Sequence, residues 1–104
     1  MGIELYDGSD VKVKVNLRAS GFDQSTDDYI IKVYNGDDEL TYTQVDVKTD
    51  GQGNYFLPIS HEDVHSGSLV VQPIAYVHDD DFPEGKRRIV GKPVNVGPII
   101  KVKR

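Results

Sequence analysis

The chain has 104 residues, the size of one ordinary domain, and a formal net charge of −5. The absence of cysteine excludes disulfides and thiolate metal sites, and the acidic balance argues against nonspecific nucleic-acid binding. The sequence has no apolar run that could span a bilayer and no N-terminal signal segment. We therefore expect one domain over residues 1–104.

The first part of the chain predicts two strands and a loop. A short strand over residues 3–6 precedes a period-two run over residues 11–17, which has one apolar face and one basic face. Residues 19–28 form a polar loop with one large apolar residue, Phe22, which we expect to pack beneath the loop.

Two turn signals divide the middle of the chain. A predicted strand over residues 29–34 leads into an Asn-Gly pair at residues 35–36, which is typical of a type I′ hairpin turn. The chain then returns as a strand over residues 40–48, whose threonines and valines fit a helix poorly. An Asp-Gly pair at residues 50–51 indicates a second turn, and the next strand begins at Tyr55.

The second half contains the only helical signal and the longest strand. Ser60 is an N-cap residue followed by two acids, but Ser-Gly at residues 66–67 limits any helix to about one turn. A long strand follows over residues 69–78. It contains Pro73, which cannot donate to a ladder and so predicts an edge position or a bulge.

The chain ends with a charged loop and a last strand. The loop spans residues 79–87, the strand spans residues 88–96, and residues 99–102 extend it beyond a break at Gly97-Pro98. About seven short strands at regular spacing favour an all-β sandwich or small barrel over helical and α/β folds. The predicted core consists of Val11, Val13, Val15, Ile31, Val33, Tyr55, Leu57, Val71 and Val77.

The charges are divided unevenly along the chain. All seventeen acids lie at or before Glu84, and only five of the twelve basic residues precede Lys86, so residues 1–85 carry −12 and residues 86–104 carry +7. One interpretation is that the last strand neutralises acidic neighbours within the domain. The other is that a basic C-terminal edge meets an acidic face on another copy or partner. The candidate interface residues are Lys86, Arg87, Arg88, Lys92, Lys101, Lys103 and Arg104.

No pattern in the chain predicts a metal or cofactor. His61 and His65 are four apart, which suits a metal only on a true helix, so surface histidines are the default interpretation. Residues 79–81 are consecutive aspartates that cannot all point at one calcium ion, so with Glu84 they predict a solvated acidic loop.

The chemistry-bearing side chains do not predict an enzyme either. The serines, histidines and acids occur in no recognisable nucleophile elbow or triad context. Five tyrosines could form an aromatic platform for sugar, although core and edge filling is the commoner use of such residues in a small sandwich. These are Tyr29, Tyr34, Tyr42, Tyr55 and Tyr76.

The segment from Tyr29 to Val96 resembles the N-terminal immunoglobulin-like module of phage baseplate upper proteins and related prophage tail domains. The stretches that carry the resemblance are residues 31–36, 50–55 (Asp-Gly-Gln-Gly-Asn-Tyr), 59–67 and 91–96, together with the opening over residues 5–10. The loop over residues 19–28 and Pro73 depart from the family pattern.

This resemblance implies an immunoglobulin-like antiparallel β-sandwich of about seven strands. It also implies a non-enzymatic assembly module of a phage or prophage tail or baseplate, with other protein subunits, possibly its own copies, as partners. The expected location is then the virion or the cytoplasm of the producing cell.

A second family shares one of these motifs. Residues 49–55 are also similar to the "TDxxGxY" turn of carboxypeptidase-regulatory-like and other prealbumin-like surface modules. That resemblance implies a bacterial cell-surface module for adhesion or glycan binding, with a leader outside the given sequence. The exposed tyrosines and the acidic loop over residues 79–81 would then form the contact surface.

Overall fold

The computed structural model describes residues 5–6 and 8–100, and its regular elements are strands and single turns of 3-10 helix. In chain order these are β1 Leu5–Tyr6, β2 Val11–Lys14, β3 Tyr29–Asn35, β4 Asp38–Thr43, η1 Gln44–Asp46, β5 Lys48–Thr49, β6 Tyr55–Ile59, η2 His61–Asp63, β7 Gly67–His78, β8 Lys86–Val90 and β9 Val94–Ile100. The all-β prediction is confirmed. No helix in the described part of the chain is long and apolar enough to cross a membrane.

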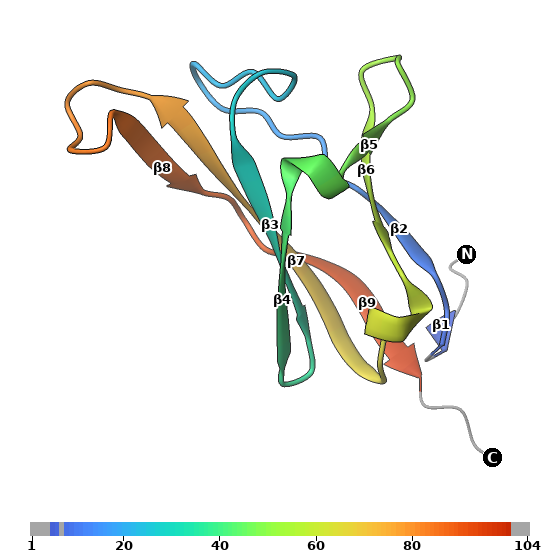
Figure 1. Cartoon of the computed structure of the whole chain (residues 1–104). Helices are drawn as coiled ribbons and strands as arrows, with labels where there is room; N and C mark the ends of the chain where they lie inside the picture. Colours follow the sequence, from blue (N-terminus) through green and yellow to red (C-terminus); the bar gives the residue numbers. More distant parts are fainter. Residues whose placement is uncertain (1–4, 7, 101–104) are drawn as a thin grey trace.

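The strands form two sheets that face each other (Figure 1). The larger sheet has the order β1-β9-β7-β3-β4, with β8 also paired to β7, and the smaller sheet has the order β2-β6-β5. In chain order this matches the immunoglobulin arrangement, in which strands B, E and D oppose strands G, F, C and C′. The short β1 pairs with β9 in parallel, and the other described strand pairs are antiparallel. The predicted β-sandwich is therefore confirmed, although its described part has nine strands rather than about seven, one parallel pair, and two 3-10 turns rather than one.

The core lies between the two sheets. Eight of the nine predicted core residues are buried; Tyr55 is only half-buried, because it begins β6 at the rim of the sandwich. Val77 is buried outside the main core cluster, where the backbone of the loop at Gly21 packs on it. The most deeply buried side chains are Ile31, Leu57, Ile59, Leu69, Val33 and Val64.

The loop after β2 is held by side chains. The run predicted over residues 11–17 stops as a strand at Lys14, because Gln24 donates to the Val15 carbonyl (2.7 Å) and accepts from the Leu17 amide (2.8 Å). Phe22 packs edge-to-face on Tyr29, with 6.1 Å between ring centroids, as predicted for the loop.

The first hairpin uses a different turn from the one predicted. Asn35 pairs with Asp38, so the two turn residues are Gly36 and Asp37. Gly36 has a φ of +61°, but no described non-glycine residue has a positive φ, and a type I′ turn needs two. The type I′ prediction is therefore wrong, and the φ signs are those of a type II′ turn.

The return strand predicted over residues 40–48 is two strands in different sheets. β4 ends at Thr43, whose amide donates to Asp46 Oδ2 (3.0 Å) across η1. Gln44 also accepts from the Tyr29 amide (3.0 Å). Because polar side chains satisfy these backbone groups, the chain leaves the larger sheet at η1 and enters the smaller one as β5.

The turn at η2 is confirmed as one turn of helix. The Ser60 hydroxyl accepts from the Glu62 amide, and the turn ends at Asp63.

Pro73 lies in the middle of a central strand. β7 pairs with β3 along one side, and on its other side it pairs first with β9 (from Gly67 to Val71) and then with β8 (from Ile74). The Pro73 carbonyl accepts from the Gly91 amide (2.8 Å), so the missing N–H of Pro73 faces the gap between these two partners. The predicted edge position or bulge at Pro73 is wrong; the register shift opposite Leu69 and Val70 leaves the extra residue, Val96, on β9.

The last predicted strand breaks earlier than expected. β8 already begins at Lys86, the break falls at residues 91–93, and β9 runs through Gly97-Pro98. A Cβ on Gly91 would lie 2.7 Å from Pro73 Cγ, so the chain passes Pro73 too closely for any other residue to continue the strand there. Of the predicted strand ends, residues 3–4 and 101–102 lie outside the described residues.

Candidate interaction surface

The feature that stands out from the sandwich is a projecting hairpin, which we call the β7–β8 arm. It consists of Ile74–His78, the loop over residues 79–85 and β8. Figure 1 shows it extending away from the two sheets, and the molecule measures 55 × 31 × 23 Å. β8 pairs only with β7 among the described strands, so its outer edge is open. A backbone hydrogen bond from Asp79 to the Gly85 carbonyl (2.8 Å) closes the loop.

Two of the predicted interface residues are neutralised within the domain. Lys86 Nζ lies 2.8 Å from Asp28 Oδ2. This hydrogen bond lowers the pKa of Asp28 and raises the pKa of Lys86. Arg87 Nε lies 3.8 Å from Asp79 Oδ2, which is an ion pair but beyond hydrogen-bond length. The self-neutralising interpretation of the charge division therefore holds for these two residues.

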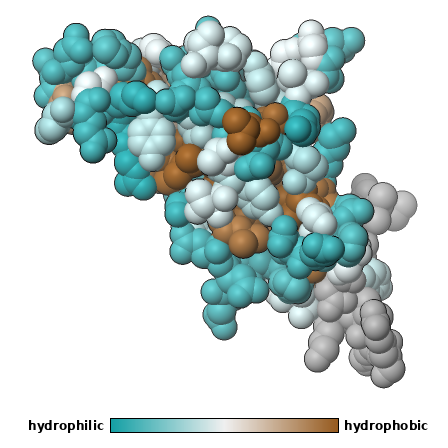
Figure 2. Space-filling model, viewed as in Figure 1, coloured by the Kyte–Doolittle hydropathy of each residue, from teal (hydrophilic) through white to brown (hydrophobic). Residues whose placement is uncertain are grey.

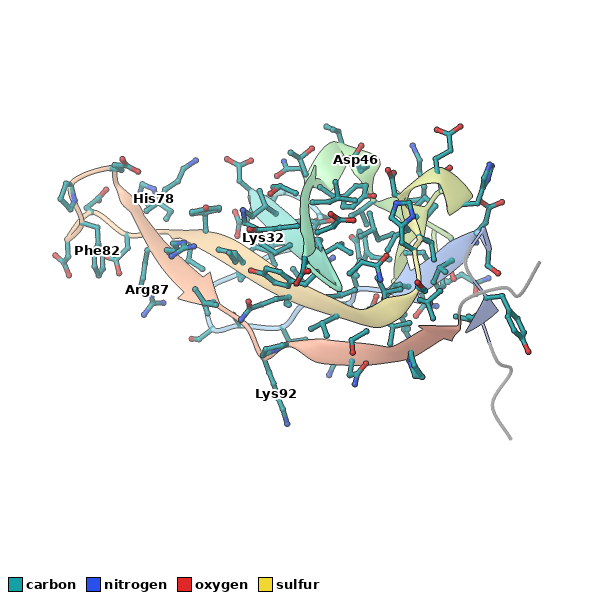
Figure 3. All side chains as sticks on the ribbon, turned by 90° about the horizontal axis from the view of Figure 1, so that it is seen from below. Lys32, Asp46, His78, Phe82, Arg87 and Lys92 are labelled. Atoms are coloured by element: carbon teal, nitrogen blue, oxygen red, sulfur yellow. The ribbon has the colours of Figure 1, made fainter. Side chains whose placement is uncertain are left out.

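The other two described basic residues have no acidic partner. Arg88 and Lys92 are exposed and make no ion pair or side-chain hydrogen bond with any residue the structure describes. Figure 3 shows Lys92 pointing away from the sheet. Lys101, Lys103 and Arg104 lie outside the described residues. Free positive charge thus remains at Arg88 on the arm and at Lys92 at its base.

An open cleft of about 270 Å³ lies at the base of the arm. Its apolar lining comes from three separate segments of the chain and consists of Leu17, Ala19, Phe22, Pro73, Ala75, Ile89 and Val94. Arg18 and Lys92 also line it. A second hollow of about 90 Å³ shares Leu17, Pro73 and Val94 with the cleft and is also lined by Val13 and Val71. The cleft offers apolar contact area next to positive charge, which suits an apolar segment that carries acidic residues.

Large apolar side chains are exposed on and beside the arm. The exposed fractions are 45% for Phe82 at the tip, 51% for Val90 and 55% for Val94. Figure 2 shows hydrophobic patches interspersed with hydrophilic residues on one face of the molecule. Phe82 lies in the loop of the arm, Val90 at the end of β8 and Val94 at the start of β9, so exposed apolar side chains occur at the tip and at the base of the arm.

The histidines do not converge on a metal. His61 Nδ1 lies 3.0 Å from Asp10 Oδ1, and the same oxygen accepts from the His61 backbone amide (2.6 Å), which lowers the pKa of Asp10. His65 uses its backbone amide to bond the buried Asn35 side chain (2.6 Å). Among the described residues, no three His, Asp or Glu side chains are grouped closely enough to hold a metal ion.

The acidic loop is organised by local contacts. Asp79 Oδ1 accepts from the Asp81 amide (3.1 Å), and Asp80 lies 3.2 Å from His78 Nε2. The aspartates therefore point in different directions, as consecutive residues must.

The tyrosines do not form one platform. Tyr29 is buried in the core, and Tyr42 donates from its hydroxyl to Asp63 Oδ2 (3.3 Å) at the edge of the sandwich. Burial of Tyr42, and to a smaller extent the negative charge of Asp63, raises the pKa of Tyr42 to about 12. Tyr34 and Tyr76 lie on the opposite face of the larger sheet, six residue pairs apart along the β3–β7 ladder.

The cleft could not be found from the sequence. Leu17 and Ile89 are far apart in the chain and read as ordinary apolar residues of two predicted strands. They come together only because the loop over residues 16–22 folds against the connection between β8 and β9.

Comparison of the chain with models of known protein families, with curated proteins and with solved structures gives no match.

Proposed function

We propose that the protein is a non-enzymatic assembly module that docks on other protein subunits, including copies of itself, through the β7–β8 arm and the cleft at its base. The observation that carries this proposal is the arm itself. It exposes Phe82, Val90 and the unpaired charge of Arg88 on a hairpin whose outer edge is open. An open strand edge beside exposed apolar and charged side chains is a common docking feature.

We place this module in a phage or prophage tail or baseplate. The support is the resemblance of residues 29–96 to immunoglobulin-like modules of baseplate upper proteins. The sandwich supplies a rigid body, and the arm and cleft supply contact surface at one end of it. Fold likeness alone does not assign a role, so the proposal depends on the arm's exposed residues.

The alternative function, a glycan-binding surface module, has less support. Such a site would need aromatic rings on one accessible face. Tyr29 is buried, and Tyr34 and Tyr76 lie far apart on the other face.

Light scattering after size exclusion, at low and high ionic strength, tests the proposal. We expect oligomers at low ionic strength that dissociate as salt screens charges beyond a Debye length of about 8 Å at physiological ionic strength. Arg88→Glu combined with Lys92→Glu should abolish them, whereas Lys48→Glu, on the exposed edge of the smaller sheet, should not. A monomer under both conditions, or oligomers indifferent to the arm variant, would contradict docking of copies through the arm.

A further inference from the structure

Two of the open edges of the larger sheet, β4 and β8, differ in charge; the third outer strand among the described residues is the short β1. β4 ends the sheet on one side, and its sequence begins with two acids after Asp37 in the turn. β8 forms an edge on the other side of β7 and begins with three basic residues. Figure 1 shows the two edges on different sides of the molecule.

The backbone groups that face outward from β4 follow from the ladder. In an antiparallel pair, residues alternate between bonding the partner strand and facing away from it. Asn35 and Asp38 close the two-residue hairpin as a bonded pair, so Glu39, Thr41 and Thr43 face away from β3. The Thr43 amide already donates to Asp46, which leaves the main-chain groups of Glu39 and Thr41 for another strand.

The same reasoning gives the outward groups of β8. At the two ends of the arm, the Asp79 amide donates to the Gly85 carbonyl and the Gly91 amide donates to the Pro73 carbonyl. Because bonded residues recur at every second position, Arg87 and Ile89 also bond to β7. Arg88 therefore presents its N–H and C=O outward. Lys86 and Val90, two residues before and after it, face outward in the same way.

We infer that β4 of one copy pairs with β8 of a second copy of this chain, so that the larger sheet continues from molecule to molecule. This inference deepens the proposed function and rests on it. If the second copy keeps the strand directions of the first, its β8 runs antiparallel to β4, because β4 is antiparallel to β3, β3 to β7 and β7 to β8. The two edges can then form an antiparallel ladder.

One register matches the backbone and brings Glu39, which also forms an ion pair with Lys32 of its own sheet (3.2 Å), next to the unpaired Arg88 of the second copy. With Glu39 opposite Arg88, Thr41 falls opposite Lys86, and these outward-facing residues form the bonded pairs. Both Glu39 and Arg88 project from the face of the sheet that lies away from the smaller sheet, as directly opposed residues must. The same register brings the turn at Asp37 toward Lys92.

Charge excludes the competing pairings of these edges. Charged edge strands normally prevent edge-to-edge association. Two β4 edges would oppose acids to acids, and two β8 edges would oppose Arg88 to Arg88. Only β4 against β8 brings unlike charges together, and this head-to-tail contact can repeat, giving rings or filaments rather than closed dimers.

Charge exchange across the contact tests the inference on the full chain. Glu39→Lys and Arg88→Glu should each weaken association at low ionic strength by at least about tenfold, because like charges then face each other. The chain that carries both substitutions should associate again, and so should an equimolar mixture of the two single variants. The matched controls are Glu62→Lys on η2 and Lys48→Glu on β5, both exposed and away from these edges, and both should leave association unchanged.

Amide hydrogen exchange supplies the second readout. Assembly should slow exchange at Thr41 and Arg88, whose amides face outward in the monomer, and should leave Lys48 unaffected. Suppose that the wild-type chain assembles. If the Glu39→Lys variant then forms the same oligomers, or if assembly does not slow amide exchange at Thr41, the β4–β8 pairing is overturned and the arm remains a docking surface. A wild-type chain that stays monomeric at low ionic strength overturns this inference and self-docking through the arm together.

Discussion

The two halves of β7 show how one strand serves two different purposes. From Gly67 to Val71 it lies between β3 and β9, and Leu69 and Val71 are buried in the main core. From Ile74 to His78 it carries the arm, where β8 is the last strand and Val90 is half exposed. The first half has a sheet opposite it and gains stability from burial. The second half extends beyond that sheet. Its Ile74, Ala75 and Val77 are still buried, whereas Phe82, Arg88 and Val90 on the following loop and β8 are exposed.

Pro73 and Gly91 mark the boundary between these regions. Because proline has no N–H to donate, the strand can change partners there without leaving a donor unpaired. Body and arm can therefore be perturbed separately.

A substitution in the core between the two sheets should have the largest effect on the free energy of unfolding. Ile31→Ala removes a fully buried side chain at the centre of β3, and we expect a loss of about 2–5 kcal/mol in the free energy of unfolding. Urea denaturation followed by circular dichroism measures this loss. The control is Val45→Ala, which removes a side chain 76% exposed on η1 and should change stability by less than about 0.5 kcal/mol. Equal effects of the two substitutions would contradict the described core.

Asn35→Ala should have the next largest effect. This buried amide donates to the His65 carbonyl (2.9 Å) and the Ser68 carbonyl (3.2 Å) and accepts from the His65 amide (2.6 Å). Its loss removes the side-chain partner of the His65 amide and carbonyl, while the Ser68 carbonyl keeps the Gly36 amide (3.0 Å), and we expect a cost of about 2–3 kcal/mol of unfolding free energy. Asn54→Ala, which removes hydrogen bonds within an exposed loop, should cost clearly less. A stability change no larger than that of the control would show that these backbone groups find other partners.

Gly91→Ala probes the boundary itself. The added Cβ would lie 2.7 Å from Pro73 Cγ and 3.2 Å from the Pro73 carbonyl oxygen, so strand and connection must shift. We expect a loss of about 1–3 kcal/mol by denaturation. Combining it with Pro73→Ala removes the ring and should recover part of the penalty in a double-mutant cycle. Additive losses from the two substitutions would mean that this close approach does not matter.

The smallest effect should come from the contact between arm and body. The pKa of Asp28 is lowered and that of Lys86 is raised, mainly by their mutual hydrogen bond. Asp28 therefore stabilises the contact of the arm with the rest of the domain above its ordinary pKa of 3.8, and this stabilisation is lost as pH falls below it. The stabilisation that Lys86 provides is lost as pH rises above 10.5.

Amide exchange at Arg87 and Ile89 measures this contact in the arm. We expect the protection to fall in acid for the wild-type chain, and Asp28→Asn should remove most of that dependence. The pair is exposed, so global stability should hardly change. A wild-type arm whose exchange follows only the intrinsic pH dependence of amides would contradict this role of the pair.

Several features could be predicted from the sequence because they depend on local patterns. Alternation along residues 11–15 and 29–34 predicts strands and buried faces, since side chains of a strand point to opposite sides in turn. The two hairpins and the single turn at Ser60 follow from turn and cap residues in the same way. The unpaired charge at Arg88 and Lys92 was likewise within the predicted set of interface residues.

Two of the errors show how a side chain or a distant residue overrides the alternation of a strand. Thr43 to Val47 looks like a strand, but the Asp46 side chain accepts from the Thr43 amide and the Gln44 side chain accepts from the Tyr29 amide of β3, and the chain moves to the other sheet. Gly97-Pro98 looks like a break, yet the chain breaks at Gly91, because Pro73, eighteen residues earlier, lies against it.

The amino-acid pattern by itself therefore determined an all-β sandwich, most of its core and an uneven division of charge, because these depend on which residues are neighbours in the chain. Only the tertiary structure decided which charges remain free, where the cleft lies and which strand edges stay open. Those properties depend on ion pairs such as that of Lys86 with Asp28, and on the change of partner strand from β9 to β8 along β7. Such pairings join residues far apart in the sequence, and no local signal records them.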